Sequence, residues 1–168
     1  MSTQITHFEV QALFIYNAET GKLFWHNPKG KQNSTTALGR YHPDGLLISI
    51  GNKPNQKTYR VARLIWFYVH GVWPAQIIDH INRNPFDNRL NNLREASHTQ
   101  NSANLSVKAN NIGGLKGAFY RAKVKKWGSS IRIAGKRKWL GCFDTKEEAH
   151  AAYMQAAKET FGEFACAG

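Results

Sequence analysis

The segment from Ile77 to Asn101 gathers the residue types that could cut a phosphodiester. It holds an Asp-His pair, a turn rich in asparagine and two further asparagines, whereas an ordinary core element would place apolar residues at period 2 or 3.6. A histidine imidazole ordinarily titrates near neutral pH, so His80 can take a proton from water. Asp79 and Asn101 offer a carboxylate and an amide oxygen, which suit Mg²⁺ or Mn²⁺. We interpret this segment as a single-metal hydrolytic site.

Each of these residues also has an ordinary structural explanation when taken alone. A single histidine is usually structural, a single aspartate usually caps or pairs, and asparagine-rich turns are usually only turns. The functional interpretation therefore depends on their order and spacing. Neighbouring residues on a strand point to opposite faces, so Asp79 and His80 need a bend or twist in order to act together.

Local patterns predict the elements that would hold this site. We expect a strand over Ile77–Ile81, a wide turn over Asn82–Arg89 and a returning strand over Leu93–Ala96. Ser97 and Gln100 match a capping box, which starts a helix with Asn101 in its first turns. This strand-turn-strand-helix order would bring Asn101 beside the Asp-His pair.

The residues upstream predict two hairpins and a helix. Short apolar runs flank a turn at Asn17–Gly21, and a turn at His42–Gly45 precedes a buried strand at Leu46–Ile50. Apolar residues then recur at three and four over Tyr59–Gly71, which predicts a buried helix ending at Gly71.

The C-terminal third predicts a small sheet with one helix. A connector rich in Asn and Gly, residues 105–114, precedes three candidate strands, Ala118–Val124, Trp127–Ala134 and Lys138–Phe143, the last two joined by a turn at Gly135-Lys136. A capping box at Thr145 and Glu148 then starts a helix with an alanine-rich face. The whole chain is therefore expected to be α+β: N-terminal hairpins and a helix, the strand-turn-strand-helix unit, then a three-stranded antiparallel sheet backed by one helix.

The charge is strongly one-sided. The chain has 23 Lys+Arg against 11 Asp+Glu, a formal net charge of +12. No acidic residue occurs between Ala96 and Phe143, whereas ten basic ones do: Lys108, Lys116, Arg121, Lys123, Lys125, Lys126, Arg132, Lys136, Arg137 and Lys138. Surfaces kept for solubility mix both signs, so this field indicates a nucleic-acid partner.

Composition excludes several other classes of protein. An apolar fraction of 42% excludes wholesale disorder. Two cysteines far apart exclude a zinc ribbon and argue against a disulfide framework. Cys142 lies in an apolar run, so we expect a buried, reduced thiol. Neither a signal-type leader nor an apolar run near eighteen residues is present, which predicts a soluble, intracellular protein with no membrane partner.

The Asp-His segment resembles the HNH (ββα-metal) nuclease family, particularly its phage and intron-encoded homing branch. Asp79 and His80 match its DH pair, Asn92 before Leu93-Arg94 its middle asparagine, and Asn101 its last position. The resemblance implies that His80 is the general base and that Asp79 and Asn101 bind the divalent metal. It also implies that Asn92 braces the turn and orients His80. Many members carry histidine at the last position, where this chain has Asn101, which favours the homing-type variant over zinc.

The C-terminal third resembles the APETALA2-type DNA-binding domain of plant ethylene-response factors. The similarity covers KGAFYRAKV, WGSSIRI, KWLGCFDTKEEAHAAY and AAKETFGEFA, between residues 116 and 165. It implies that the outward residues of the sheet contact double-stranded DNA in the major groove. Strand alternation then selects six candidate DNA-binding residues: Arg121, Lys123, Lys125, Arg132, Lys138 and Trp139.

The two resemblances together predict a metal-dependent, site-preferring DNA endonuclease. Its expected domains are a nuclease domain at 1–104, a linker at 105–114 and a DNA-binding domain at 115–168, encoded by a phage and acting in the bacterial cytoplasm. Two alternatives stay open: a DNA-binding regulator without nuclease activity, and a nuclease directed at RNA or at branched structures. The sequence leaves open whether the protein is a monomer or a homodimer.

Overall fold

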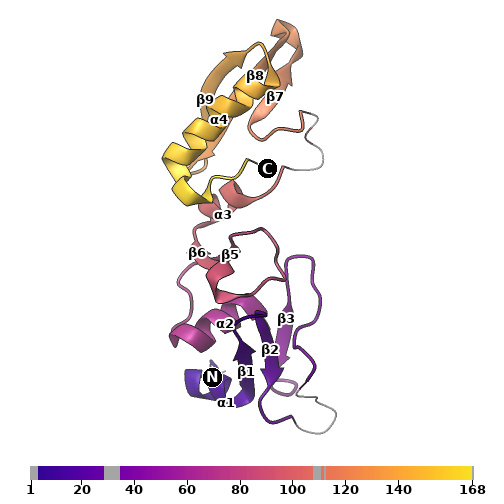
Figure 1. Cartoon of the computed structure of the whole chain (residues 1–168). Helices are drawn as coiled ribbons and strands as arrows, with labels where there is room; N and C mark the ends of the chain where they lie inside the picture. The colour runs from indigo at the N-terminus through magenta and orange to yellow at the C-terminus, as the bar shows by residue number, and fades with distance from the viewer. Residues whose placement is uncertain (1–3, 29–34, 108–110, 112, 168) are drawn as a thin grey trace. The chain divides into compact units, whose positions relative to one another are not determined.

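The computed structural model describes residues 4–28, 35–107, 111 and 113–167. Its internal contacts divide the chain into two compact units, residues 1–95 and 96–168, and each is treated by itself below (Figure 1). Lys108 and part of the predicted linker, residues 108–110 and 112, lie outside the described residues.

The first unit begins with a helix and a hairpin. Helix α1, His7–Leu13, is capped by Thr6, whose side chain accepts from Glu9 while the Glu9 carboxylate bonds back to the cap. Strands β1, Phe14–Asn17, and β2, Lys22–Trp25, pair antiparallel across the predicted turn. The hairpin was expected from the sequence, but α1 was not, because its short run shows no helical period.

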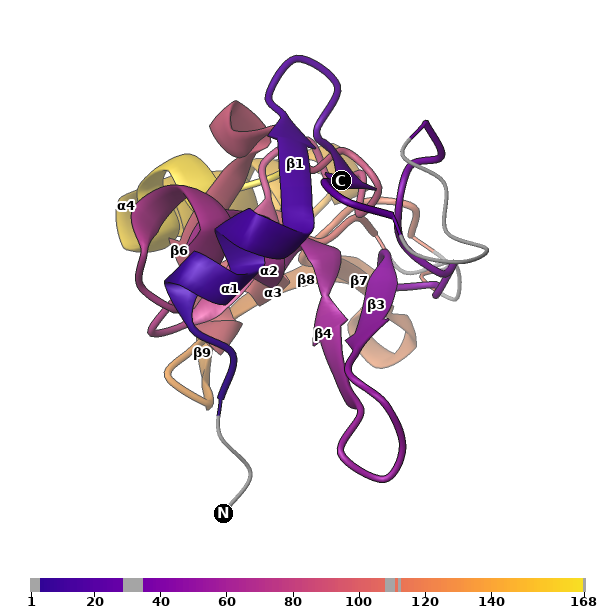
Figure 2. The same ribbon diagram turned by 90° about the horizontal axis from the view of Figure 1, so that it is seen from below.

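A second hairpin leads into the main helix of this unit. Strands β3, Leu47–Ile50, and β4, Lys57–Arg60, pair antiparallel, and helix α2 covers Val61–His70 (Figure 2). The helix begins two residues later than expected, because Tyr59 and Arg60 pair with the β3 strand. Gly71 ends the helix as predicted, with a left-handed φ of 72° that suits glycine.

The core of the first unit lies between α2 and the N-terminal hairpin. Its fully buried side chains come from α1, β1, β2 and α2: Val10, Phe14, Leu23, Val61, Leu64 and Ile65. Trp73 stacks on Phe67 and on Tyr59, with ring centroids 4.2 and 5.5 Å apart. Arg63, on α2, donates to the carbonyls of Pro74 and Gln76, so the helix fixes the chain directly before the next strand.

The predicted strand-turn-strand follows. Strand β5, Ile77–His80, neighbours β6, Leu93–Ala96, in a two-stranded sheet, and the short 3₁₀ helix η1, Leu90–Asn92, precedes β6. Helix α3, His98–Asn104, comes next, capped by Ser97 with Gln100 bonding back, which confirms the predicted capping box. The contacts group α3 with the second unit.

The second unit contains the predicted three-stranded sheet. Its elements are β7 (Ala118–Arg121), η2 (Ala122–Val124), β8 (Lys126–Ile133), β9 (Lys136–Phe143), α4 (Lys146–Phe161) and η3 (Gly162–Phe164). The strands are antiparallel in the order β7-β8-β9. The β8–β9 turn is Ala134-Gly135, one residue earlier than predicted, and both of its residues have positive φ.

Helix α4 covers one face of this sheet (Figure 1). Ile131 packs with Tyr153 and Ala157, and the capping box of Thr145 and Glu148 starts the helix as predicted. Small alanines on the buried face let the helix lie close to the strands. Among the described residues of the second unit, α4 is the helix that packs on all three strands, and the opposite face is called the helix-free face below.

The architecture confirms the α+β class expected from the sequence. Within the described residues, none of the helices has the length and apolar character needed to cross a lipid bilayer.

Candidate functional site

Asp79 is a buried carboxylate held by an arginine. It lies next to the end of β5 with 4% of its surface exposed, and its Oδ2 accepts from Nε of Arg94 on β6 at 2.9 Å. Both side chains of the pair are shielded from water, which strengthens their attraction and fixes the carboxylate in one orientation. Strand β5 thus carries Asp79, and the neighbouring strand β6 carries the arginine that holds its carboxylate.

His80, the next residue, is half-buried and bonded to the turn. Its Nε2 lies 3.0 Å from Oδ1 of Asn88, whose side chain is only 1% exposed. The imidazole is therefore oriented by a residue in the turn between β5 and β6.

Asn92 closes the base of that turn. Its Oδ1 accepts from the backbone N–H of Asn82 at 2.9 Å, and its Nδ2 donates to Oδ1 of Asn82 and to the carbonyl of Asp87. The Ile81 N–H also donates to the Asn92 carbonyl. A buried asparagine with these bonds ties both ends of the turn together, which suits the bracing role expected from the sequence.

An ion pair stiffens the outer part of the turn. Arg89 donates to both carboxylate oxygens of Asp87, at 2.8 and 2.6 Å. These bonds from Arg89, with that from Asn82, lower the pKa of Asp87 to about 2. Asp87 is thus a structural carboxylate that stays charged at neutral pH.

Asn101 is carried by α3, in the second unit. Its backbone N–H donates to the Ser97 carbonyl at 2.9 Å and its side chain is half-buried. His98, three residues before Asn101 in the same helix, is exposed. Asp79 and His80 belong to the first unit, so the convergence of Asn101 with them stays a prediction.

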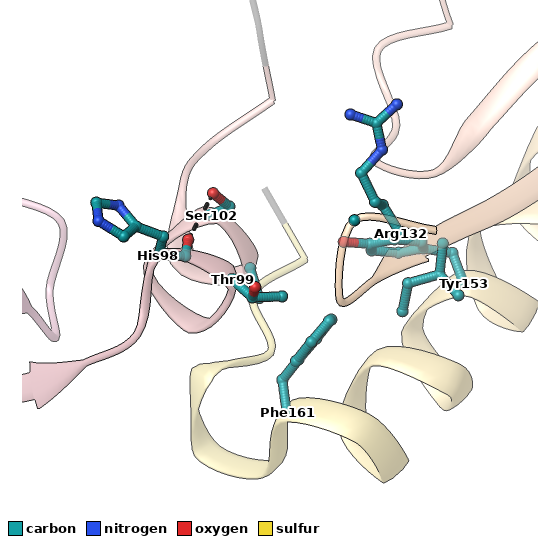
Figure 3. A pocket seen from close by; sticks show the side chains of 9 residues that line it. His98, Thr99, Ser102, Arg132, Tyr153 and Phe161 are labelled. Carbon is teal, nitrogen blue, oxygen red and sulfur yellow. Dashed lines mark hydrogen bonds between the residues drawn. The ribbon is translucent and has the colours of Figure 1, made fainter. Parts of the chain in front are cut away.

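The C-terminal end of α3 is bonded to the chain that leads into β7. Nζ of Lys116 donates to the carbonyls of Ala103 and Leu105 at 2.5 and 2.7 Å, where a helix leaves carbonyls unsatisfied. A pocket of about 290 Å³ lies between α3, the β8–β9 end and α4. Tyr153 and Phe161 point toward it, whereas the His98 ring and the Arg132 guanidinium point away (Figure 3).

The donor set of the candidate metal site consists of hard oxygens. Among the residues that the structure describes, no three His, Cys, Asp or Glu side chains gather where they could hold a metal ion. A carboxylate and an amide, the pair expected here, would leave most coordination positions to phosphate and water. The hydrogen bond from Arg94 gives Asp79 the kind of support that ligating carboxylates have.

The helix-free face of the C-terminal sheet carries an aromatic and basic cluster. Arg121 lies over the Trp139 ring at 5.2 Å and Arg137 over the Phe119 ring at 4.9 Å, while the two rings meet edge to face. Arg137 also donates to Ser130 Oγ. Cation–π contacts hold these guanidinium groups in place and leave them exposed.

The register corrects the position of three candidate DNA-binding lysines. Lys138 pairs with Ile131, whose side chain packs under α4, so Lys138 points to the helix side of the sheet. Lys123 lies in η2 and Lys125 has a left-handed φ of 50°, so strand alternation does not apply to them. Arg121, Arg132 and Trp139 lie in strands, and Arg132 pairs with Arg137 on the helix-free face.

Cys142 is also placed differently than expected. It is exposed, pairs with Gly128 and accepts from Nη1 of Arg121 at 3.2 Å. The register shift at Ser129/Ser130 turns this end of β9, and with it the thiol, away from the helix. Cys142 and Cys166 are both free thiols.

Comparison with known proteins identifies the nuclease part of the chain. Residues 59–103, from β4 through most of α3, match the HNH endonuclease family, so the chain contains an HNH endonuclease domain. It belongs to the same family as Protein 3.8 of Escherichia phage T7, with 31% identity over 102 residues, which cover 60% of this chain and 84% of that protein.

A second relative is an uncharacterized HNH endonuclease of Acanthamoeba polyphaga mimivirus. It is 37% identical over 100 residues, which are 58% of this chain and 50% of that protein, so the chain spans half the relative's length. No solved structure matches the chain significantly.

Sequence reasoning missed the hydrogen-bond partners of Asp79, the expected metal ligand, and of His80, the expected general base. Arg94 and Asn88 both lie in the motif that carries the resemblance, but their contacts with Asp79 and His80 depend on how β5, β6 and the turn fold together. Arg137 was missed because the turn before it was placed one residue late. A register that put Arg137 opposite Arg132 would have found it.

Proposed function

We propose that this protein is a metal-dependent endonuclease that hydrolyses phosphodiester bonds in double-stranded DNA with site preference, in the manner of homing endonucleases. The HNH domain at residues 59–103 supports a nuclease. The observation that carries the proposal is the orientation of His80 and Asp79 on β5, one by Asn88 and the other by Arg94.

In this proposal His80 takes the proton from the attacking water. Its imidazole is half-buried, and its Nε2 is hydrogen-bonded to Asn88 in the turn. Nδ1 is therefore the ring nitrogen that would take the proton. Asn92 keeps the turn closed behind it. The ring therefore needs no reorientation before the proton moves.

Asp79 and Asn101 would hold the divalent ion, Mg²⁺ or Mn²⁺. When bound, such an ion supplies positive charge to the phosphate and the leaving oxygen. Arg94 keeps the Asp79 carboxylate in one orientation, and the capped helix α3 presents Asn101.

The sheet of the second unit would bind the DNA, as an APETALA2-type domain does. Arg121, Arg132, Arg137 and Trp139 form an exposed basic and aromatic face with no acidic neighbour between residues 96 and 143. Guanidinium groups on such a face can contact phosphates and the edges of guanine. Base contacts from this face would give the site preference.

A plasmid-nicking assay tests the proposal. We expect His80→Ala to bind DNA with wild-type affinity and to lose nicking in Mg²⁺ or Mn²⁺, by about 100-fold or more. His26→Ala, which changes an exposed histidine in the first unit, is the matched control and should nick normally. Wild-type cleavage by His80→Ala would refute the mechanism.

The same assay decides between substrates and between classes. Duplex DNA, branched DNA and RNA are compared at equal concentration, with and without the divalent ion. Preferential cutting of branched DNA or RNA would replace double-stranded DNA as the substrate. Binding without cutting under all conditions would identify a DNA-binding regulator.

A further inference from the structure

The His80–Asn88 contact determines more than the direction of the ring. In the contact at 3.0 Å, Nε2 of His80 faces the amide oxygen of Asn88, which can only accept a hydrogen bond. Nε2 must therefore carry the proton in the neutral imidazole. The lone pair then belongs to Nδ1, the only other ring nitrogen.

The burial of Asn88 indicates that its amide is present for this contact. Asn88 is 1% exposed, and its Nδ2 has no hydrogen-bond partner among the described residues. A buried N–H without a partner costs about 1–3 kcal/mol. An apolar residue of similar size would avoid that cost, so stability alone does not explain an asparagine here.

The N-terminal hairpin holds Asn88 from behind. The Tyr16 hydroxyl donates to the Asn88 carbonyl at 3.1 Å and accepts from the Leu90 N–H at 3.0 Å. A Cβ at Gly21, in the β1–β2 turn, would lie 2.4 Å from the backbone N of Arg89 and 2.6 Å from the carbonyl carbon of Asn88. The hairpin thus lies directly against the backbone that presents the amide.

We propose that Asn88 is a positioning residue that fixes His80 in the tautomer with the proton on Nε2. The proton of the attacking water then goes to Nδ1, while the proton on Nε2 stays there and keeps its hydrogen bond to Oδ1 of Asn88. The β1–β2 hairpin, through Tyr16 and Gly21, keeps the amide in register with the imidazole. This inference rests on the proposed function of His80 as the general base.

Single-turnover nicking rates of four variants test the inference, alongside DNA affinity and melting temperature. Asn88→Leu removes the acceptor and should lower the rate about 100-fold at unchanged DNA affinity. Asn88→Asp keeps an acceptor oxygen and should stay within about tenfold of wild type. Tyr16→Phe keeps the ring but loses both hydroxyl bonds, and we expect an intermediate rate. Asn91→Ala changes an exposed asparagine in η1 and should match wild type.

Nitrogen-15 NMR of the His80 ring provides a readout that a purely structural role would not change. We expect a proton on Nε2 of the neutral ring in wild type and in Asn88→Asp, and a mixture of tautomers in Asn88→Leu. A proton on Nδ1 in the wild-type protein overturns the inference, even if Asn88→Leu fails to fold.

The His80→Ala variant separates this inference from the function on which it rests. A wild-type rate in Asn88→Leu, with His80→Ala inactive, overturns the role of Asn88 and leaves the proposed base intact. Full activity in His80→Ala would instead show that His80 is not the general base. A slow Asn88→Leu with a wild-type melting temperature, and rescue by Asn88→Asp, supports the inference.

Discussion

A buried ion pair between Asp79 and Arg94 lies at the centre of the candidate site. Their side chains are 5% and 11% exposed, so water solvates neither charge well. Desolvation offsets much of the attraction in such a pair, which therefore contributes little compared with an apolar pair of the same size. Removing one partner is different, because the remaining charge stays buried and loses this ion pair.

We therefore predict that Arg94→Met lowers the free energy of unfolding of the first unit by about 3–5 kcal/mol. Arg60→Met is the matched control, because Arg60 pairs with Asp44 at 3.5 Å with both side chains largely exposed. That change should cost about 1 kcal/mol or less. Urea unfolding followed by tryptophan fluorescence measures both free energies. Equal losses in the two variants would contradict the prediction that the burial of the Asp79–Arg94 pair makes its loss more costly.

At the scale of elements, the sequence predicts local structure well and side-chain placement less well. Capping boxes at Ser97 and Thr145 were identified correctly because the signal lies within four residues. The face of Lys138 was not, because it depends on the register of β8 against β9. Lys138 and Trp139 are neighbours in β9 and face opposite sides, and this register assigns Trp139, not Lys138, to the helix-free face.

The candidate site shows the same limit. The motif places Asp79 and His80 on a strand and Asn92 at the end of a turn, as expected. Their partners come from long-range folding: Tyr16 contacts a turn 72 residues away in sequence. Local patterns do not contain that information, so the support for His80 became visible only in the structure.

The packing of α4 on the sheet gives a prediction at this scale. Gly117 and Gly135 have nearly the same left-handed φ, 78° and 79°. A Cβ at Gly117 would lie 2.1 Å from Cγ of Tyr153, whereas a Cβ at Gly135 meets nothing within 4 Å. Since the backbone strain is shared, the difference between the two alanine variants isolates the close approach.

We predict that Gly135→Ala lowers the free energy of unfolding of the second unit by about 1 kcal/mol. Gly117→Ala should cost about 2–4 kcal/mol, because Tyr153 and α4 must also shift. Chemical denaturation measures both variants. Equal losses of stability in the two variants would mean that Tyr153 moves aside without strain and that α4 packs loosely on the sheet.

At the scale of the whole molecule, the net charge of +12 predicts salt-sensitive DNA binding. The structure sorts the basic residues of the C-terminal sheet into two sets. Arg121, Arg132 and Arg137 are assigned to the helix-free face, whereas Lys136 and Lys138 pair with Ile133 and Ile131 on the α4 side. If net charge alone determined DNA affinity, both sets would contribute equally. In the proposed interface only the arginines of the helix-free face contact DNA.

Two triple variants with the same change in charge separate these possibilities. Arg121→Gln/Arg132→Gln/Arg137→Gln should weaken DNA binding and flatten the dependence of log K on log salt by up to about 0.9 for each lost phosphate contact. Lys136→Gln/Lys138→Gln/Lys158→Gln, on the α4 side, should leave most of the slope. Fluorescence anisotropy with labelled duplex DNA across a salt series measures both slopes. Equal slopes in the two variants would mean that the protein binds through its overall field, and the helix-free face would lose its assignment as the DNA-binding surface.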